Sequence, residues 1–430
     1  MELSAYGRRL LRDSGARSLM ADLGAVAEAG GDIMNLGGGT PSLIPAAEAV
    51  FRRHMQRLLQ PGGAFGRAIG TYGGPDGDRG FARALAALLR RELGWAVGPR
   101  NIALTNGSQS AFLALFNLLA GPAGGGRPAR RILLPLAPEY IGYADVGFAP
   151  GLFTSRRPAI HDLGDRLFKY GVDFEGLDAI EDIGAICLSR PTNPTGNVVT
   201  DAEVERLRAA ARARGVPLIL DTAYGSPFPG IVFGDATPVW DEHTVVCMSL
   251  SKLGLPGLRT GIVIANEAII EALVAATAIF CLAPGSLGPA LATDLVASGE
   301  VLALARDVVR PHYAARARRA VDRLRAGLEA YDVRIHKPEG AFFLWLWMPG
   351  LPITNGALYE RLKARGVIVV SGHYFFPGLE DDDWPHKREC IRISYADDWG
   401  RIERGLDIIA DEVRRAYDGG AAVHRPRSGS

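Results

Sequence analysis

The chain has 430 residues, 48% of them hydrophobic and 22% charged, so it can bury enough apolar surface to fold into about two to three domains, which excludes a disordered chain. Its 48 basic and 47 acidic residues are mixed along the sequence, and the net charge of +1 excludes a strongly basic surface for nucleic acid or membranes. The four cysteines, Cys187, Cys247, Cys281 and Cys390, show no paired spacing, so we expect reduced thiols and no disulfide or metal site.

The first 45 residues are Gly-rich and carry arginines where a signal peptide would have a continuous apolar core, so we expect a cytoplasmic protein. The most apolar stretch, residues 272–283, is about half as long as a transmembrane helix. This N-terminal segment, residues 1–45, is too short to form a core alone and is predicted to pack with the C-terminal domain.

Between residues 100 and 265, short apolar runs alternate with helical patterns, which is typical of βαβ units and a largely parallel sheet. Continuous apolar runs of this kind suit strands that are buried on both faces. We therefore predict a large α/β domain over residues 46–290, with strands at Ile102–Thr105, Arg131–Pro135, Gly184–Ser189, Val216–Leu220, Thr244–Met248 and Gly261–Ala265.

Beyond residue 290 the pattern changes to long Ala-, Leu- and Arg-rich helices, as in residues 300–331, and then to strand-like segments. These segments are Ala341–Trp347, Val367–Val370 and Cys390–Tyr395. We predict a smaller α+β domain over residues 291–418 and a disordered tail over residues 419–430.

The junction between the first strand and the following apolar helix contains Gly107, Ser108 and Gln109. Free backbone amides and the positive end of a helix dipole meet at such a turn, so it suits a bound phosphate. A serine at a helix start is also an ordinary N-cap, and taken alone this motif leaves both interpretations open.

Two further strand ends carry candidate ligand groups. Tyr140 follows the strand that ends at Pro135 and offers a flat aromatic surface, although buried tyrosines are common. Asn193 lies in a turn between two prolines, which would hold its amide ready to donate to a ring oxygen or a substrate carboxylate. A plain turn is the alternative for Asn193.

Asp221 directly follows the strand at residues 216–220, and Tyr224 comes three residues later. Ligands of parallel sheets bind at the carboxyl ends of the strands. An aspartate there can pair with a protonated pyridine nitrogen, and a tyrosine can donate to the phenolate oxygen of the same ring. A helix cap is the competing explanation for Asp221.

Lys252 is one of only five lysines among the 48 basic residues. It follows a buried strand and has Ser249, Ser251 and Arg259 nearby. Partial burial and a cationic neighbour lower the pKa of a lysine, while hydroxyls and an arginine can hold a phosphate. Because arginine cannot serve as an amine nucleophile, a lysine in this otherwise arginine-rich chain indicates Schiff-base chemistry at Lys252.

Arg392 lies in the alternating segment Cys390–Ser394, in which Ile391 and Ile393 face one way and Arg392 the other. An inward Arg392 would bind an α-carboxylate with two parallel hydrogen bonds. An outward surface arginine is the alternative.

The spacing of these motifs links them. Asn193, Asp221 and Lys252 are separated by about one βαβ unit each, so successive crossovers would bring them to one edge of the sheet. The combination predicts one site that holds a phosphorylated pyridine ring.

The motifs, in their order, resemble the aspartate-aminotransferase superfamily of fold-type I pyridoxal 5′-phosphate enzymes over nearly the whole chain. The resemblance rests on the segments NIALTNGSQSAF, PLAPEYIGYAD, SRPTNPTGN, AYGSPFPGI, CMSLSKLGLPG, HKPEGAFFLWLW and SGHYFFPGL. It implies a seven-stranded, mainly parallel sheet in the large domain, pyridoxal 5′-phosphate as cofactor, and amino acids and 2-oxo acids as substrates, with L-valine and pyruvate as the pair.

Carried over by position, the resemblance also implies the role of each candidate residue. For the ring it implies Lys252 as the Schiff-base lysine, Asp221 on the pyridine nitrogen, Tyr224 and Asn193 on the ring oxygen, and Tyr140 stacked on the ring. For the phosphate it implies Gly107, Ser108, Gln109, Ser249, Ser251 and Arg259. It further implies Arg392 on the substrate carboxylate, Gly39 at the pocket entrance, and Tyr72 lent to the phosphate of a partner subunit, hence a homodimer.

Two other functions remain open at this point. A lyase or synthase could use the same cofactor motifs, because one carbanion can be protonated, eliminate or cyclise. A ligand-sensing regulator on this scaffold would need a DNA-binding domain before it, and the first 45 residues contain no basic helix-turn-helix pattern, so we expect an enzyme.

Overall fold

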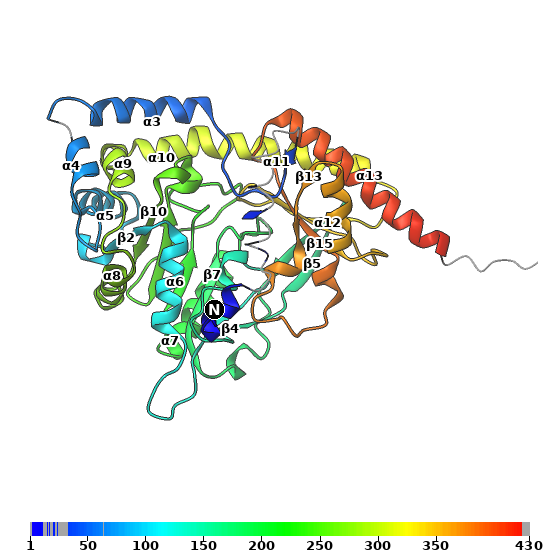
Figure 1. Cartoon of the computed structure of the whole chain (residues 1–430), viewed down its shortest axis with the longest axis horizontal. Coiled ribbons are helices and arrows are strands. Elements are labelled where there is room, and N and C mark those ends of the chain that lie inside the picture. Colours follow the sequence, from blue (N-terminus) through cyan, green and yellow to red (C-terminus); the bar gives the residue numbers. More distant parts are fainter. Residues whose placement is uncertain are drawn as a thin grey trace, which may run out of the picture.

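The computed structural model describes residues 2–11, 15, 17, 20–21, 24, 33–62 and 64–423, with side chains up to residue 419. Two mixed α/β lobes are built around two separate sheets (Figure 1). The larger sheet belongs to the lobe on the left of that view and the smaller sheet to the lobe on the right.

The large sheet has seven strands in the order β2-β10-β9-β8-β7-β3-β4, which confirms the predicted seven-stranded sheet. Only β10 runs antiparallel to its neighbours, so the sheet is mainly parallel. Six of the strands match the apolar runs of the sequence, and the short edge strand β4 was not predicted. Their bounds are β2 Ile102–Asn106, β3 Arg131–Leu134, β4 Phe153–Ser155, β7 Ile183–Ser189, β8 Leu218–Asp221, β9 Thr244–Ser249 and β10 Thr260–Ile264.

Helices cover both faces of this sheet, which explains why its strands are apolar throughout. In β10, Ile262 and Ile264 face the core formed with α5 and α9, whereas Val263 faces the core formed with α6 and α8. The helices of this lobe are α3 Pro45–Leu58, α4 Phe65–Gly70, α5 Arg79–Leu93, α6 Ser108–Leu119, α7 Asp201–Ala213, α8 Glu267–Cys281 and α9 Leu287–Ala297.

The small sheet has six strands in the order β14-β15-β12-β11-β6-β5. Its bounds are β5 Ala159–Gly164, β6 Leu167–Gly171, β11 Arg334–His336, β12 Phe343–Trp347, β14 Val370–Ser371 and β15 Cys390–Ser394. The predicted strand at residues 367–370 is divided: β13, Val367–Ile368, pairs instead with β1, Met34–Asn35, of the N-terminal segment.

The hairpin β5–β6 lies within the predicted large-domain range of 46–290 but pairs with β11 of the small sheet. In β6 the burial alternates between half-buried and buried side chains from Leu167 to Tyr170, and its partner β11 lies more than 160 residues away along the chain. A continuous boundary at residue 290 therefore does not describe how the two sheets divide the chain.

The helix expected over residues 300–331 is interrupted. It consists of α10 Glu300–Leu304, a π-helical segment at Ala305–Val309, and α11 Arg310–Gly327. Pro311 lacks the amide hydrogen that would continue the regular ladder, so a local change of pitch at this point is expected. This helical run connects the two lobes along the top of Figure 1.

Two more helices, α12 Asn355–Ala364 and α13 Trp399–Val423, complete the small lobe. The tail was expected from Gly419, but α13 continues to Val423 because a formed helix extends more easily than it begins. Residues 424–430 lie outside the described residues.

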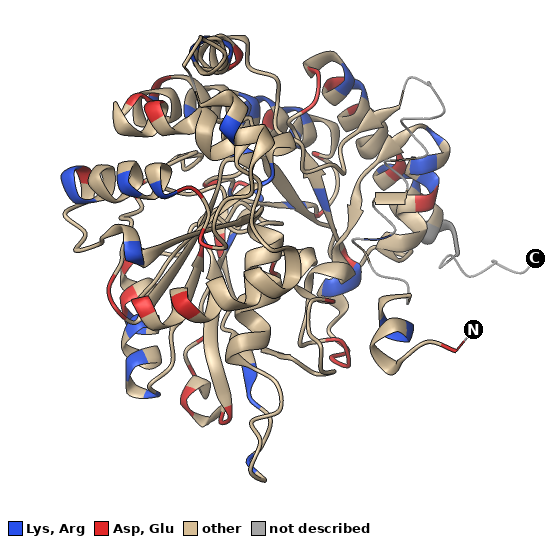
Figure 2. Cartoon of the chain, turned by 60° about the vertical axis from the view of Figure 1, so that its left-hand side comes forward, with Lys and Arg blue, Asp and Glu red and all other residues tan. Residues whose placement is uncertain are grey.

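Acidic and basic residues are interspersed over the described surface, in keeping with the near-zero net charge (Figure 2). Among the described helices, none alone is both long and apolar enough to cross a membrane, and a pair bent by 91°, Leu287–Ala297 with Glu300–Gly327, passes that test only when its helices are taken together.

Candidate active site

The carboxyl ends of three neighbouring strands place the predicted site residues at one edge of the large sheet. Ser189 of β7 is paired with Asp221 of β8, and Asp221 with Cys247 of β9. The loop that holds Asn193 follows β7, and the short 3-10 helix Ser251–Leu253, which carries Lys252, follows β9. The structure thus brings Asn193, Asp221 and Lys252 to the same edge, as the spacing predicted.

Lys252 lies between aromatic rings. Its Nζ is 5.3 Å from the centroid of the Tyr224 ring and 5.6 Å from that of Phe342, and it donates a hydrogen bond of 2.6 Å to the carbonyl oxygen of Gly39. Burial, followed by the positive charge of Arg392, lowers the pKa of Lys252 to about 8. Near neutral pH a useful fraction of this amine is therefore unprotonated and nucleophilic.

Asp221 is a buried carboxyl with both oxygens engaged. Oδ2 accepts a hydrogen bond of 2.7 Å from the hydroxyl of Tyr143, and Oδ1 accepts one of 2.9 Å from the backbone amide of Ala223. Burial raises the pKa of Asp221, and these two hydrogen bonds oppose that increase. The carboxyl is held in one orientation close to Lys252.

Arg392 points inward, which decides between the two interpretations of its strand. It is 2% exposed and donates to Asn193 Oδ1 at 2.7 Å and to the carbonyl oxygen of Gly37. Because a guanidinium only donates, the oxygen of the Asn193 amide must face Arg392, which leaves Nδ2 to donate elsewhere. Burial lowers the pKa of Arg392 to about 10, so the group stays charged at neutral pH.

The Nε atom of Arg392 is among the buried side-chain nitrogens of the described residues that have no hydrogen-bond partner. A buried unpaired donor on a charged group is costly unless a ligand or water satisfies it. A carboxylate bound beside this guanidinium would satisfy it and would offset the charge.

A cradle of backbone and hydroxyl groups lies at the start of α6. Gly107 precedes the helix with φ of 82°, and no side chain caps the first amides. A Cβ atom on Gly107 would lie 2.0 Å from Nη2 of Arg259, so only glycine permits this close approach. Exposed helix amides next to an arginine form a binding place for a phosphate dianion.

The other predicted phosphate residues surround this turn. Ser108 Oγ donates to the carbonyl oxygen of Met248 at 3.1 Å, so α6 is tied to the end of β9. Ser249 Oγ accepts a hydrogen bond of 3.0 Å from the amide of Ser251, and Gln109 Nε2 donates to the carbonyl oxygen of Gly142 at 2.7 Å. The turn is therefore tied to the strand that leads to Lys252.

Tyr140 lies at the start of the short 3-10 helix Ile141–Tyr143, where its ring meets the ring of Tyr143 edge-on at a centroid distance of 5.3 Å.

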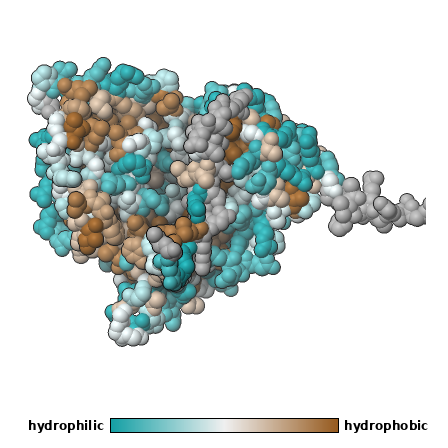
Figure 3. Space-filling model, in the orientation of Figure 1, coloured by the Kyte–Doolittle hydropathy of each residue, from teal (hydrophilic) through white to brown (hydrophobic). Residues whose placement is uncertain are grey.

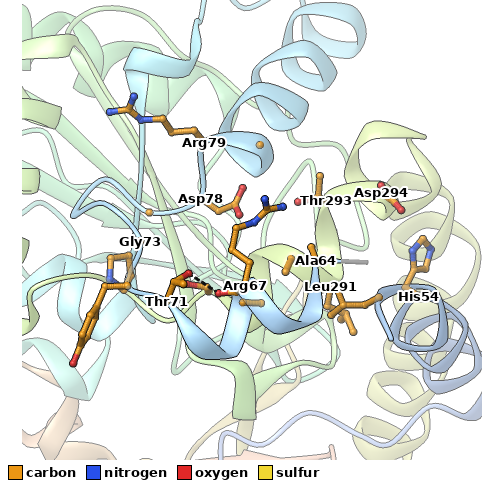
Figure 4. A pocket seen from close by; sticks show the side chains of 18 of the residues that line it. His54, Ala64, Arg67, Thr71, Gly73, Asp78, Arg79, Leu291, Thr293 and Asp294 are labelled. Carbon is orange, nitrogen blue, oxygen red and sulfur yellow. Dashed lines mark hydrogen bonds between the residues drawn. The ribbon is translucent and has the colours of Figure 1, made fainter. Parts of the chain in front are cut away.

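Tyr72 lies away from these residues. It is 87% exposed and lines a pocket of about 460 Å³ formed by α3, α4 and α9. Figure 4 shows this pocket, with Arg67, Asp78 and Arg79 around it. Within the described residues of a single chain, no contact connects Tyr72 to Lys252.

Three residues of the site were not predicted from the sequence. Tyr143 binds Asp221, Phe342 lies against Lys252, and Glu139 is fully buried, where it accepts hydrogen bonds from the amide and the hydroxyl of Ser189. Burial raises the pKa of Glu139 to about 8. The spacing of two tyrosines in EYIGY was visible in the sequence, but only the turn shows that the second one faces Asp221.

These groups fit pyridoxal 5′-phosphate and a carboxylate substrate. The cofactor would use the buried lysine with its lowered pKa, the oriented carboxylate close to it, and the uncapped helix start beside an arginine. The substrate carboxylate would use the buried arginine with its unpaired nitrogen. The fold and these residues define the class of lysine-dependent pyridoxal-phosphate enzymes of fold type I.

Comparisons with known proteins agree. Residues 31–409 match the family described as aminotransferase class I and II. The chain therefore belongs to the class I and II aminotransferases, whose cofactor is pyridoxal 5′-phosphate.

Individual relatives cover almost the entire chain. It is 50% identical to the valine–pyruvate aminotransferase of Escherichia coli, over 97% of this chain and 99% of the relative. The crystal structure of a putative amino-acid aminotransferase from Psychrobacter arcticum has a TM-score of 0.94 and 43% identity, covering 97% of this chain and 99% of that chain. That of the valine–pyruvate aminotransferase from Salmonella typhimurium has a TM-score of 0.86 and 47% identity, covering 94% and 100%.

Proposed function

We propose that this aminotransferase moves the amino group between L-valine and pyruvate in the cytoplasm, giving 3-methyl-2-oxobutanoate and L-alanine by a ping-pong mechanism. The substrate pair is supported by the names of the two valine–pyruvate aminotransferases that are 50% and 47% identical to this chain. The centroids of the Phe343 and Phe375 rings lie 4.2 and 5.2 Å from Cζ of Arg392, so the guanidinium that would bind the carboxylate has apolar neighbours.

The observation that carries the proposal is the distribution of charge around Lys252. The cations that act on it among the described residues are Arg392 and Arg259, and Arg259 lies at the phosphate turn. Arg392 is thus left for one substrate carboxylate. Among the described residues of one chain, no second cation near Lys252 is left for the side-chain carboxylate of a dicarboxylic amino acid, and burying such a carboxylate unpaired is costly.

In this proposal Lys252 binds the cofactor and then acts as general base and acid. When bound, pyridoxal 5′-phosphate supplies an electron sink for the electrons of the substrate Cα–H bond. Lys252 Nζ would take the proton from the substrate Cα as general base and would donate it again as general acid. Its lowered pKa, at about 8, suits both directions of this transfer.

The remaining residues orient the two ligands. Asp221 would face the pyridine nitrogen, Tyr224 and Asn193 Nδ2 would donate to the ring oxygen, and Tyr140 would stack on the ring. Gly107, Ser108, Gln109, Ser249, Ser251 and Arg259 would hold the phosphate. Arg392 and Asn193 would hold the substrate carboxylate, with Gly39 at the pocket entrance.

Incubating the purified holoprotein with L-valine alone tests the reaction type and the substrate together. We expect about one equivalent of 3-methyl-2-oxobutanoate per site and conversion of the cofactor to pyridoxamine phosphate, because a ping-pong enzyme stops after the first half-reaction. Pyruvate added afterwards should release one equivalent of alanine. L-aspartate serves as the matched donor with a second carboxylate and should react more slowly.

Release of ammonia or of pyruvate from the amino acid would contradict transamination and would favour the lyase or synthase alternative. Faster reaction with L-aspartate than with L-valine would leave the aminotransferase intact but would overturn the proposed substrate pair. A panel of amino donors against pyruvate then defines the range.

We also infer a homodimer. Large apolar side chains are exposed on α4 and at the end of α8, where Ile69, Ile279 and Leu282 are 61%, 82% and 66% exposed. Figure 3 shows apolar surface on the side of the molecule where these helices lie. Tyr72 is exposed next to α4, so association through this face would present its hydroxyl to the partner subunit.

Light scattering on the holoprotein should give a mass of about two 45.9 kDa chains. Substituting arginine for Ile279 should shift the protein toward monomers, because a buried unpaired charge opposes association. The matched control is Leu163→Arg, which changes a side chain that is 47% exposed in strand β5 of the small sheet. A holoprotein that stays monomeric at high concentration would contradict the dimer.

A further inference from the structure

We propose that Tyr143 is a positioning residue that keeps the Asp221 carboxylate ionised and aimed at the pyridine nitrogen of the bound cofactor. The inference rests on the role proposed above for Asp221. It adds a residue that touches neither substrate nor cofactor and acts through its contact with Asp221.

Hydrogen bonds to both oxygens of the Asp221 carboxylate fix its orientation. Tyr143 donates to Oδ2 of Asp221 at 2.7 Å, and the amide of Ala223 donates to Oδ1 at 2.9 Å. Two donors from different elements, one from the turn after β3 and one from the loop after β8, determine the rotation of the carboxylate plane. Without the Tyr143 hydroxyl, only the Ala223 amide would restrain it.

The Tyr143 ring is itself held in place. It is fully buried and meets three rings, Phe112 at 4.9 Å, Phe116 at 5.2 Å and Tyr140 at 5.3 Å, with interplanar angles of 62°, 84° and 89°. Its amide donates to the carbonyl oxygen of Tyr140 at 3.0 Å. Edge-on packing of this kind fixes the direction of the hydroxyl before any ligand binds.

The hydrogen bond from Tyr143 also favours the ionised form of Asp221. Burial and the neighbouring Asp221 raise the pKa of Tyr143 well above 10, so the phenol stays protonated and can only serve Asp221 as a donor. Burial raises the pKa of Asp221, and the largest opposing effect is the hydrogen bond from Tyr143. The titratable groups that interact with Asp221 from the surrounding elements are Glu139, Tyr140, Cys187, Tyr224, Cys247 and Lys252.

Of these groups only Lys252 carries a positive charge, and its lowered pKa means that this charge is partly lost near pH 8. Lys252 is also the residue that proposed catalysis requires in its neutral form. Tyr143, together with the Ala223 amide, therefore stabilises the Asp221 anion whatever the protonation state of Lys252, and Tyr143 makes the larger contribution of the two.

Tyr143→Phe tests the proposal, since phenylalanine keeps the packed ring and removes only the hydroxyl. A hydrogen bond to a charged group is worth enough to predict about a ten- to hundredfold weaker binding of pyridoxamine phosphate to the apoprotein, with a similar loss of kcat/KM in the holoprotein. Because the pKa of Asp221 rises in the variant, affinity should be lost on acidification about one pH unit earlier than in the parent. A purely structural role would not move that pH.

Tyr170→Phe is the matched control. Tyr170 is also fully buried, and its hydroxyl accepts a hydrogen bond of 2.9 Å from Trp345 Nε1 in the small lobe. This variant should change the melting temperature without shifting the pH dependence of pyridoxamine phosphate binding. If Tyr143→Phe folds poorly, Tyr143→His retains a ring donor and should show a smaller pH shift than complete removal of the donor.

Asp221→Asn separates this inference from the proposed function. If Asp221→Asn weakens pyridoxamine phosphate binding and Tyr143→Phe added to it has no further effect, the two residues act as one unit, as proposed. If Asp221→Asn weakens binding but Tyr143→Phe alone matches the parent in affinity and pH dependence, the inference about Tyr143 is overturned and the role of Asp221 stands. If Asp221→Asn itself has no effect on binding, the role proposed for Asp221 fails.

Discussion

Replacing Lys252 by alanine is expected to lower kcat for L-valine with pyruvate by about 10⁴-fold, the upper end of what a general acid–base group contributes. No other amine in the described residues lies at the site: Lys169 is paired with Glu339, and Lys387 donates to three backbone carbonyls. Steady-state alanine formation measures the effect. The variant should still bind the cofactor without covalent attachment, because the phosphate turn and Asp221 are unchanged.

Two variants control for charge and for loss of fold. Lys252→Arg keeps the positive charge but offers no amine nucleophile, so it should be as inactive as Lys252→Ala. Lys337→Ala removes a lysine whose side chain is 51% exposed and lies 3.5 Å from Glu339, and it should turn over normally. A Lys252→Ala protein that transaminates at the parental rate would overturn the mechanism.

Replacing Arg392 by glutamine is expected to lower kcat/KM for L-valine by about 10²- to 10³-fold, because two charge-assisted hydrogen bonds to the substrate carboxylate are lost. Asn193 Oδ1 and the carbonyl oxygen of Gly37 also lose their charged donor. Arg392→Lys should fall between the parent and the glutamine variant, since an ammonium keeps the charge but cannot form the fork.

The discriminating measurement compares L-valine with isobutylamine, which has the same side chain and amine but no carboxylate. If Arg392 binds the carboxylate, Arg392→Gln should lower kcat/KM for L-valine and leave kcat/KM for isobutylamine nearly unchanged. The ratio of the two constants, which is the preference for L-valine, should therefore fall by nearly the same factor as kcat/KM for L-valine. Arg388→Gln is the matched control, because that side chain is 60% exposed and pairs with Asp383 at the surface. An equal loss for both amines would show that Arg392 supports the fold and does not bind the carboxylate.

Much of the large lobe follows from local sequence. Strands β2, β3, β7, β8, β9 and β10 coincide with apolar runs because each is buried on both faces and leaves no place for polar residues. The short edge strand β4 was missed since three residues carry no period. The hairpin β5–β6 was assigned to the wrong neighbourhood because its pairing with β11 is a long-range contact that no local pattern records.

In the site, too, local sequence predicts some residues, and others depend on long-range contacts. Lys252, Asp221 and Asn193 were predicted because they follow strands at a βαβ spacing, and parallel strands end at a common edge. Tyr143 and Phe342 were missed because their approach to Asp221 and Lys252 depends on a turn and on the position of β12, which comes from the other lobe.

The sequence by itself determined which chemical groups the site contains. These are the amine of Lys252 in an arginine-rich chain, the carboxylate of Asp221 and the amide of Asn193 at neighbouring strand ends, and the glycine turn before a helix. Only the tertiary structure decided that Arg392 points inward, that Asn193 turns its amide oxygen toward Arg392, and that burial lowers the pKa of Lys252 to about 8. The physical reason is that residue type sets which bonds and charges are available. Orientation, burial and the distances between charges arise from contacts between segments far apart in the chain.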